Sequence, residues 1–277
     1  MTDRGNALLL TGKDDPTQKW LDRLKSRWSV VVFESDTSIV GFRCDVRQPS
    51  ADTVMIVVHH LEHSRSQRVL WLLEELGLTY EVRHYRRNPE TMLAPASLKA
   101  VHILGKSPVV TEEEQVFAES GAIIEHLTER NPAAGLAPAP SDPQRFRYLY
   151  WLHFAEGSAM TPLLLKLIVD RLEGSRAPLI VRPVIRSISG HMRRTLVTPR
   201  LEDILNFMEA ELARSTWFAG DRFTAADIQM SFPVQAALAR GGSVNALPHL
   251  RSFAERIESR PSYKRALERG GKFEILR

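Results

Sequence analysis

Cysteine is almost absent from this chain of 277 residues, in which Cys44 is the only one. A single thiol cannot form an intramolecular disulfide or a CxxC redox pair, and it cannot supply the thiolate ligands of a metal site. Disulfide-stapled domains and enzymes with a redox cysteine pair are therefore excluded. A reducing, cytoplasmic setting fits this composition best.

Long apolar runs are also missing. The opening residues MTDRGNALLLTGKDDPTQKW interrupt a short apolar run with Lys13, Asp14 and Asp15, too early for the apolar region of a signal peptide. No later run approaches the roughly 18 apolar residues that a membrane span requires. The composition, 43% hydrophobic and 25% charged, is that of an ordinary globular protein. We therefore expect a soluble chain with no membrane partner.

One stretch lacks acidic residues altogether. Between Glu173 and Glu202 there is no Asp or Glu, whereas six arginines occur there: Arg176, Arg182, Arg186, Arg193, Arg194 and Arg200. Such a stretch is either a solvated helix face or loop, or a mouth that attracts anionic ligands. The net charge of +4 is otherwise mixed along the chain. Because no nucleic-acid motif or interleaved aromatic pattern appears, we expect no nucleic-acid partner.

The length exceeds that of a typical single domain and predicts two compact units. Residues 1–54 contain a candidate helix at TQKWLDRLKSRW and a candidate strand at SVVVFE, without a supersecondary pattern that would form a core. We expect this extra N-terminal segment to be disordered or only loosely docked.

From Met55 onward the pattern becomes regular. MIVVHH is a β-branched run typical of a buried strand. From Ser66 to Leu76 the apolar residues recur at helical spacings, and Gly77 follows as a helix stop. TYEVRHY then alternates like a second strand. A helix between two short strands predicts a parallel pair joined by a right-handed crossover.

The rest of this unit adds a weak helix within PETMLAPASLKAVHILGKSPVV, two short strands in VVTEEEQVFAES and a helix at SGAIIEHLTER. The predicted order over residues 55–130 is therefore βαβαββα. The Pro- and Ala-rich residues 131–143, NPAAGLAPAPSDP, form the clearest linker in the chain.

Residues 144–277 are predicted to be helical throughout. The first helix, RFRYLYWLHFAEGSAMTPLLLKLIVDRL, is long, and Pro162 is expected to kink it. Two further helical stretches lie between Pro178 and Arg214. The segment TAADIQMSFPVQAALARGG begins with Thr224 and Asp227 at capping-box spacing. The last two helices, PHLRSFAERIESR and PSYKRALERGG, each open with a proline.

The first motif that carries chemistry is HSRSQR, where the first strand leads into the helix. A hydroxyl at a helix N-terminus lies in a field that stabilises a nearby anion. Without an adjacent base, Ser64 is a weak nucleophile. It is better suited to donate a hydrogen bond to the thiolate of a ligand and lower the pKa of that thiol. Plain helix capping is the alternative for both Ser64 and Ser66.

The second motif is GKSPVV. A proline directly before an internal strand cannot donate to the sheet, so Pro108 indicates a turn, with a cis bond as one option. A cis Ser107–Pro108 bond would present the main chain of Ser107 to an extended peptide ligand. Lys106 would then offer a cation to a carboxylate of that ligand. An ordinary turn is the alternative.

The third motif is AESGAIIEHL. Ser120, at the start of a helix, supplies a hydroxyl and free backbone N–H groups that can hold a carboxylate. Glu119 beside it can accept a hydrogen bond from an ammonium group. Together they suit an amino-acid head group, and a simple helix cap is again the alternative.

These motifs together resemble the cytosolic glutathione S-transferases. HSRSQRVLWLLEELGLTYE, LGKSPVV and ESGAIIEHL occur in that family's order, and FAGDRFTAADI resembles the capping box of its second domain. The resemblance covers about residues 55–277 and is closest to serine-type members of a bacterial and fungal group. It implies an α/β thioredoxin-like N-terminal domain (βαβαββα) that binds glutathione, followed by an all-α helical bundle domain over residues 144–277 that binds the acceptor substrate.

The resemblance also implies roles for single residues. Ser64 matches the serine whose hydroxyl stabilises the glutathione thiolate, and Ser66 is the less favoured candidate. The other matching positions hold the rest of glutathione. They are Lys106 for the glycyl carboxylate, Ser107 before the expected cis-Pro108 for the cysteinyl main chain, and Glu119 with Ser120 for the γ-glutamyl head.

In this family the acceptor substrate contacts the first long helix of the second domain. The matching candidates here are Tyr148, Trp151, His153 and Glu156, with core packing as the alternative for the aromatic residues. Two features depart from the family pattern. His102 and Ile103 stand where many members have Asn-Pro, and Met55 lies where family chains usually begin. An upstream start codon assigned in error or a genuine appendage would explain residues 1–54.

The implied reaction follows from thiol chemistry. A free thiol with a pKa near 8.5 is mostly protonated at neutral pH, and only its thiolate attacks. Lowering that pKa by about two units corresponds to about 2.7 kcal/mol of preferential anion stabilisation. The resemblance implies a homodimeric glutathione transferase that attacks a small hydrophobic electrophile or reduces an organic hydroperoxide. Glutathione would be its co-substrate, with no other cofactor and no metal.

Two other functions remain open on the same residues. A glutathione-dependent disulfide-bond reductase could use the thiol of glutathione itself, because the chain has no active-site cysteine. A non-catalytic glutathione-binding or protein-interaction module is the alternative outside enzymology.

Overall fold

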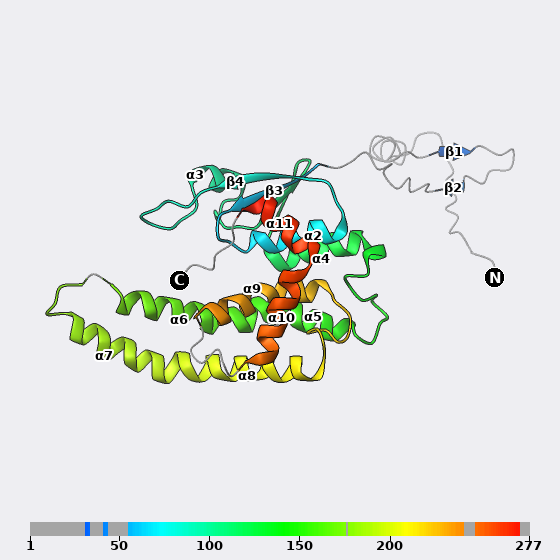
Figure 1. The fold of residues 1–277 in the computed structure, drawn as a ribbon. Helices are drawn as coiled ribbons and strands as arrows, with labels where there is room; N and C mark the ends of the chain where they lie inside the picture. Colours follow the sequence, from blue (N-terminus) through cyan, green and yellow to red (C-terminus); the bar gives the residue numbers. More distant parts are fainter. Residues whose placement is uncertain (1–30, 34–40, 44–54, 176, 241–246, 272–277) are drawn as a thin grey trace, which may run out of the picture. The chain divides into compact units, whose positions relative to one another are not determined.

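The structure is a computed structural model that describes residues 31–33, 41–43, 55–175, 177–240 and 247–271 (Figure 1). The chain divides into two units, Met1–Thr53 and Val54–Arg277. In the first unit, β1 (Val31–Phe33) pairs antiparallel with β2 (Gly41–Arg43). The strand predicted at SVVVFE is therefore present as β1. The helix predicted at TQKWLDRLKSRW lies outside the described residues.

The second unit begins with a mixed four-stranded sheet. Its strands are β3 (Ile56–Leu61), β4 (Tyr80–Tyr85), β5 (Val109–Glu112) and β6 (Gln115–Ala118), in the spatial order β4-β3-β5-β6. β3 runs parallel to β4, as predicted, and antiparallel to β5, which in turn pairs antiparallel with β6. All six residues of β3 are buried, which is why its sequence is a continuous rather than an alternating apolar run.

Three helices complete the first half of this unit: α2 (Ser66–Leu76), α3 (Ala96–Val101) and α4 (Ser120–Arg130). The observed order confirms the predicted βαβαββα arrangement. α2 ends at Gly77, whose φ of 66° is the left-handed conformation that glycine adopts without strain. Leu70, Leu72 and Leu73 are fully buried. Burial of each such side chain contributes about 1.5–3 kcal/mol, so α2 is a central element of the core.

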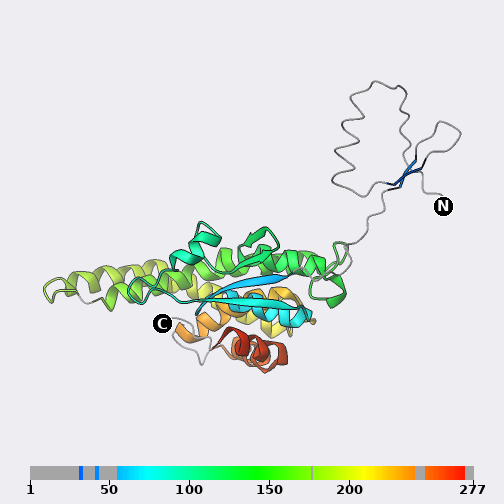
Figure 2. The same cartoon turned by 90° about the horizontal axis from the view of Figure 1, so that it is seen from above.

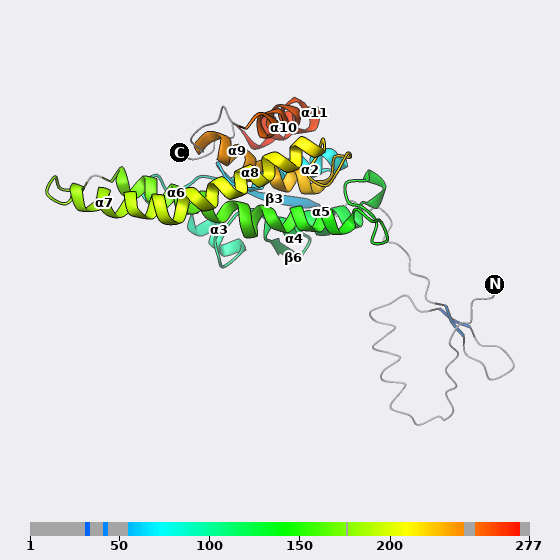
Figure 3. The same ribbon diagram turned by 90° about the horizontal axis from the view of Figure 1, so that it is seen from below.

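The second half is helical, as predicted. Its elements, after η1 (Pro132–Ala134) in the linker, are α5 (Arg145–Phe154), η2 (Ala155–Ala159), α6 (Met160–Glu173), α7 (Arg182–Met192), η3 (Arg193–Val197), α8 (Thr198–Arg214), α9 (Ala225–Arg240), α10 (Pro248–Ser259) and α11 (Pro261–Gly270). Figure 2 shows α2 next to the sheet, and Figure 3 shows α6 running beside α7.

The first long helix, in which Pro162 was expected to cause a kink, is interrupted upstream of that proline. A single π-helical turn, η2, separates α5 from α6, and the N–H of Met160 bonds to the carbonyl of Ala155, five residues earlier. Pro162, buried two residues farther on, has no N–H for the carbonyl four residues before it. The irregular part of this helix is therefore the π turn, a feature frequent at functional sites, together with the proline that follows it.

Within the described residues, the stretch Arg145–Glu173 is long and apolar enough to cross a bilayer by length and composition alone. We expected no such stretch from the sequence. Tyr148, Trp151 and Leu152 on this stretch are buried in the protein core. Its apolar character is thus used in part for packing inside the protein, as in the core helices of other proteins.

The capping box at the start of α9 is confirmed. The Asp227 carboxylate accepts hydrogen bonds from the Thr224 N–H at 2.8 Å, the Thr224 hydroxyl at 3.1 Å and the Phe218 N–H at 2.9 Å. Burial raises the pKa of Asp227 to about 6, against the effect of these donors. This box fixes the beginning of the helix that carries Gln229 and Phe232 to the site.

Candidate functional site

A cavity of about 620 Å³ lies where the end of β3 meets the N-terminus of α2. Six residues singled out from the sequence line it together: Ser64, Lys106, Ser107, Pro108, Glu119 and Ser120. They come from three separate connections, after β3, before β5 and before α4. The fold therefore brings all three sequence motifs to one place.

Ser64 lies between β3 and α2 and is 5% exposed. Its Oγ accepts the backbone N–H of Ser66 at 3.3 Å, so part of the predicted capping role is present. The same Oγ lies 2.7 Å from Ser66 Oγ and 3.3 Å from Ser107 Oγ. Because the N-terminus of α2 follows directly, an anion next to Ser64 would be stabilised by the helix dipole.

The turn before β5 has the predicted cis bond between Ser107 and Pro108. The Ser107 hydroxyl donates to the carbonyl of His59 at 3.1 Å and accepts the N–H of Leu61 at 3.3 Å. The side chain of Ser107 is therefore used to fasten the turn to β3. Lys106, one residue earlier, is exposed and lines the cavity.

The turn before α4 holds Glu119 in a left-handed conformation, with φ of 71°. Ser120 follows as the first helical residue and is 4% exposed. Glu119, the N-cap residue of α4, makes no side-chain capping bond, and Ser120 Oγ accepts a hydrogen bond from Arg68 at 2.9 Å. The Ser120 side chain therefore has a use other than a simple helix cap.

Arg68 is a site residue that the sequence analysis missed. It is 2% exposed, and its guanidinium also donates to the carbonyl of Gln229 at 2.8 Å and to the Glu156 carboxylate at 2.6 Å. Burial lowers the pKa of Arg68 to about 10, with Glu156 opposing that effect, so the side chain is charged at neutral pH. The sequence feature that could have indicated this role is a basic residue on the apolar face of a predicted helix, next to Val69.

Three of the four residues that were predicted to line the acceptor pocket from the first long helix do not line the cavity. Tyr148 and Trp151 are 0% and 1% exposed and belong to the core, and His153 is exposed but does not line the cavity. α5 packs against α9, and the first long helix lines the cavity only from η2 onward. Of the four candidates, Glu156 alone is at the cavity.

The second half of the chain contributes a different set of lining residues, which come from η2, α6 and α9. They are Glu156, Met160, Leu164, Leu167, Arg171 and Phe232. Nothing in the sequence alone marked the last five, because each has the spacing of an ordinary helix residue. The guanidinium of Arg65 lies 5.3 Å from the centre of the Phe232 ring and 3.2 Å from Glu156, which joins this set to the start of α2.

The cavity carries charges of both signs. Lys106, Arg65, Arg87 and Arg171 are basic lining residues, whereas Glu119 and Glu156 are the acids described above. His102, at one of the two positions that depart from the family pattern, also lines the cavity, and Ile103 is 86% exposed. Such a lining fits a ligand with carboxylates and an ammonium group. No metal-binding group of His, Cys, Asp or Glu occurs among the described residues.

The chain matches the sequence model of the glutathione S-transferase N-terminal domain over residues 53–129 and that of the C-terminal domain over residues 195–261. It is 33% identical to glutathione S-transferase 3 of Schizosaccharomyces pombe over 78% of this chain and 88% of that protein. A crystal structure of a glutathione S-transferase from Actinobacillus pleuropneumoniae is 32% identical, with a TM-score of 0.65, over 79% and 94% of the two chains. The disulfide-bond oxidoreductase YfcG of Escherichia coli is 26% identical over 77% of this chain and 94% of that protein.

Proposed function

The chain belongs to the cytosolic glutathione S-transferase superfamily, and we propose that it activates the thiol of glutathione for attack on a small apolar electrophile. The observation that supports this most is the shared cavity, which Ser64, Lys106, Ser107, Glu119 and Ser120 line together. Family membership alone leaves the catalytic residue and the second substrate open.

In the proposed mechanism the Ser64 hydroxyl donates a hydrogen bond to the sulfur of bound glutathione. A hydrogen bond to the charged form of a group favours that form, so the pKa of the thiol falls. The N-terminus of α2 adds to this effect. The thiolate then forms the new carbon–sulfur bond directly, and no covalent intermediate with the protein is required.

The remaining contacts to glutathione follow from its charges. Lys106 pairs with the glycyl carboxylate, the main chain of Ser107 pairs with the cysteinyl residue, and Glu119 and Ser120 hold the γ-glutamyl head. Because Arg68 donates to Ser120 Oγ, the Ser120 hydroxyl proton is left to donate to that head's carboxylate.

The acceptor substrate would lie against the opposite side of the cavity. Met160, Leu164, Leu167 and Phe232 give that side an apolar surface, which favours a hydrophobic electrophile over a polar one. An organic hydroperoxide is a second acceptor of this kind, reduced at the expense of two glutathione molecules that become glutathione disulfide.

Replacing Ser64 tests the proposal. In Ser64→Ala, turnover at pH 7 should fall about 25-fold, because a rise of the thiol pKa from about 6.5 to about 8.5 lowers the thiolate fraction by that factor, while glutathione binding stays nearly unchanged. The assay uses aryl halides, epoxides, isothiocyanates and hydroperoxides. Ser189→Ala is the matched control, since Ser189 is a fully buried serine on α7 away from the cavity. Unchanged turnover in Ser64→Ala would refute the role of Ser64, and inactivity of the wild type across the panel would favour a non-catalytic module.

A second candidate function is glutathione-dependent disulfide reduction, favoured by the similarity to YfcG. One glutathione thiolate would attack the disulfide and release a thiolate, and a second glutathione would resolve the mixed disulfide to glutathione disulfide. A mixed disulfide added to the same panel distinguishes the two functions, because a reductase would turn it over faster than any electrophile.

We also propose that the protein is a cytoplasmic homodimer. The only cysteine lies outside the described residues, so no disulfide argument bears on assembly. Light scattering on the full chain would test the dimer, with a monomer mass of 31.4 kDa as the contrary result.

A further inference from the structure

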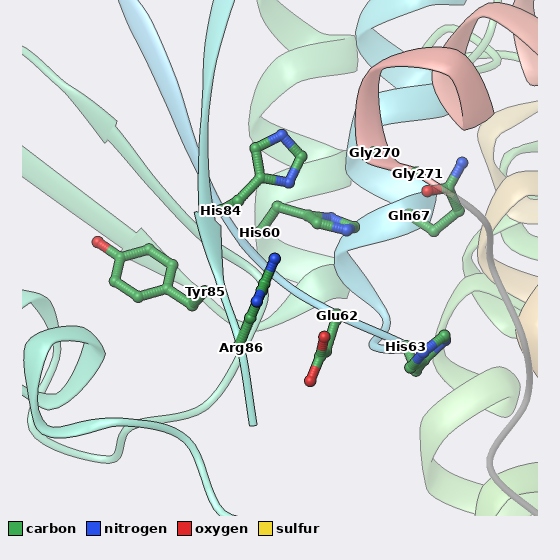
Figure 4. Close-up of a pocket in the computed structure, with 9 residues that line it drawn as sticks. All are labelled: His60, Glu62, His63, Gln67, His84, Tyr85, Arg86, Gly270 and Gly271. Atoms are coloured by element: carbon green, nitrogen blue, oxygen red, sulfur yellow. The ribbon is translucent and has the colours of Figure 1, made fainter. Parts of the chain in front are cut away.

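A second cavity, of about 290 Å³, adjoins the glutathione cavity at His63, which lines both. Figure 4 shows its side chains, contributed by β3, β4, the start of α2 and the residues at the end of α11. His60 is 4% exposed and lies beside Gly270 in this view. The proposed function makes no use of His60.

A chain of hydrogen bonds connects His60 to Ser64. His60 Nδ1 lies 2.9 Å from Ser66 Oγ, which lies 2.7 Å from Ser64 Oγ. All three side chains are buried. Every hydroxyl in such a chain has one proton to donate, so the state of His60 determines in which direction the others point.

The surroundings of His60 fix that state. Burial lowers the pKa of His60 to about 4, with a smaller effect from His84, so the ring is neutral at working pH. A hydrogen bond to the backbone of Gly270 acts to raise this pKa, which is the effect of a bond that the ring donates. Because Nδ1 faces Ser66, the donor is Nε2. The charged and titratable groups around the cavity are His84, His63, Glu62 and Arg86.

The direction of the remaining bonds follows. A neutral ring protonated on Nε2 has an accepting Nδ1, so Ser66 donates to His60. Ser66 Oγ is then the acceptor in its bond with Ser64, and Ser64 donates to Ser66. Ser64 also donates to Ser107 Oγ at 3.3 Å, because the Ser107 proton goes to the carbonyl of His59. Both acceptors lie within the protein, and the bond to Ser66 is the shorter one. The Ser64 proton is thus directed into the protein, away from the place of the glutathione sulfur.

We propose that Ser66 and His60 are positioning residues that hold the Ser64 hydroxyl proton away from bound glutathione and so limit how strongly Ser64 stabilises the thiolate. The inference rests on the proposed role of Ser64. To donate to the sulfur, Ser64 must break its hydrogen bond to Ser66. The two uses of one proton therefore compete.

This competition predicts the direction in which the pKa of the bound thiol changes when Ser66 is replaced. Removing the acceptor in Ser66→Ala should lower the pKa of the bound thiol and raise the thiolate fraction below that pKa about fivefold, which corresponds to about 1 kcal/mol for one hydrogen bond. If the chain pointed the other way, with His60 donating through Ser66 to Ser64, the same variant would raise that pKa, because Ser64 would lose a supporting donor.

The test is a pH titration of the thiolate absorbance of glutathione bound to the full chain. Ser66→Ala should give the lower pKa, Ser66→Thr should restore the wild-type value because it keeps a hydroxyl, and Ser189→Ala should leave that value unchanged. His60→Phe serves as a second variant. It removes the acceptor of Ser66 and should shift the thiol pKa in the same direction as Ser66→Ala.

The outcomes separate the two proposals. An unchanged or raised pKa in Ser66→Ala, with a wild-type pKa below that of free glutathione, overturns the inference and leaves the role of Ser64 intact. A wild-type protein that binds glutathione without lowering the pKa of its thiol overturns the proposed function and the inference with it.

Discussion

The two sides of the cavity that we propose to bind glutathione are built differently. One side, here called the tripeptide wall, consists of Ser64, Lys106, Ser107, Glu119 and Ser120, all in connections or at helix starts of the sheet domain. The other, the acceptor wall, consists of Met160, Leu164, Leu167 and Phe232 on helices.

The difference between the walls corresponds to two recognition tasks. Main-chain groups, serine hydroxyls and the opposite charges of Lys106 and Glu119 suit a ligand that never changes, such as glutathione. Flexible aliphatic side chains such as Met160 and Leu164 suit acceptors that share only apolar character. We infer that changes in the tripeptide wall alter catalysis and glutathione binding, whereas changes in the acceptor wall alter the choice of second substrate.

The largest effect is expected where the walls are joined. Arg68 donates to Ser120 on one side and to Glu156 and Gln229 on the other. Arg68→Met should lower the free energy of unfolding by roughly 3 kcal/mol, since it removes a buried guanidinium and leaves the Gln229 carbonyl and Ser120 Oγ without their donor. Glu156 keeps its ion pair with Arg65. Urea unfolding measures this loss.

A matched control for Arg68 is Arg214→Met. Arg214 pairs with Glu211 at 3.3 Å, but its side chain is 76% exposed, so the expected loss is below about 1 kcal/mol. Equal losses in the two variants would contradict the view that Arg68 joins the walls.

An intermediate effect is expected on the tripeptide wall. Lys106→Met should weaken glutathione binding about tenfold at low salt, the size of one charge-assisted hydrogen bond, and the difference from wild type should shrink as salt is added. Calorimetric titration measures both. Lys99→Met is the control, because Lys99 is exposed on α3 and does not line the cavity; a similar loss there would point to a general charge effect.

The smallest effect is expected on the acceptor wall. Leu164 is 49% exposed, so Leu164→Ala should remove only part of its apolar contact and raise KM for an apolar electrophile about threefold. KM for glutathione should not change. Leu172→Ala, two turns along α6 and away from the cavity, should change neither value. If Leu164→Ala changed only KM for glutathione, Leu164 would belong to the tripeptide wall, and its assignment to the acceptor wall would be contradicted.

The walls also differ in how far the sequence could predict them. The strand and helix order around the tripeptide wall follows from local patterns, such as the apolar run of β3 and the glycine after α2, and its lining residues lie in short motifs at the element ends. For the motif GKSPVV the sequence left two options open, a cis bond before Pro108 or an ordinary turn. Local sequence carries this information because each motif forms its own turn or helix start.

The acceptor wall could not be predicted in the same way. Tyr148, Trp151 and His153 were expected at the cavity, but which face of a helix points there is decided by packing against α9 and by the π turn after α5. The role of Arg68 was not predicted from the sequence for a related reason. Its partner Gln229 is 161 residues away in the chain, so its role depends on a contact that no local pattern contains.

The central claim is that Ser64 lowers the pKa of the glutathione thiol. The most direct measurement is the pH titration of the bound thiolate in the wild type and in Ser64→Ala, with saturating glutathione in both. We predict a wild-type pKa about two units below the ordinary value near 8.5, and a return most of the way to that value in Ser64→Ala. Equal pKa values in the two proteins would contradict the account.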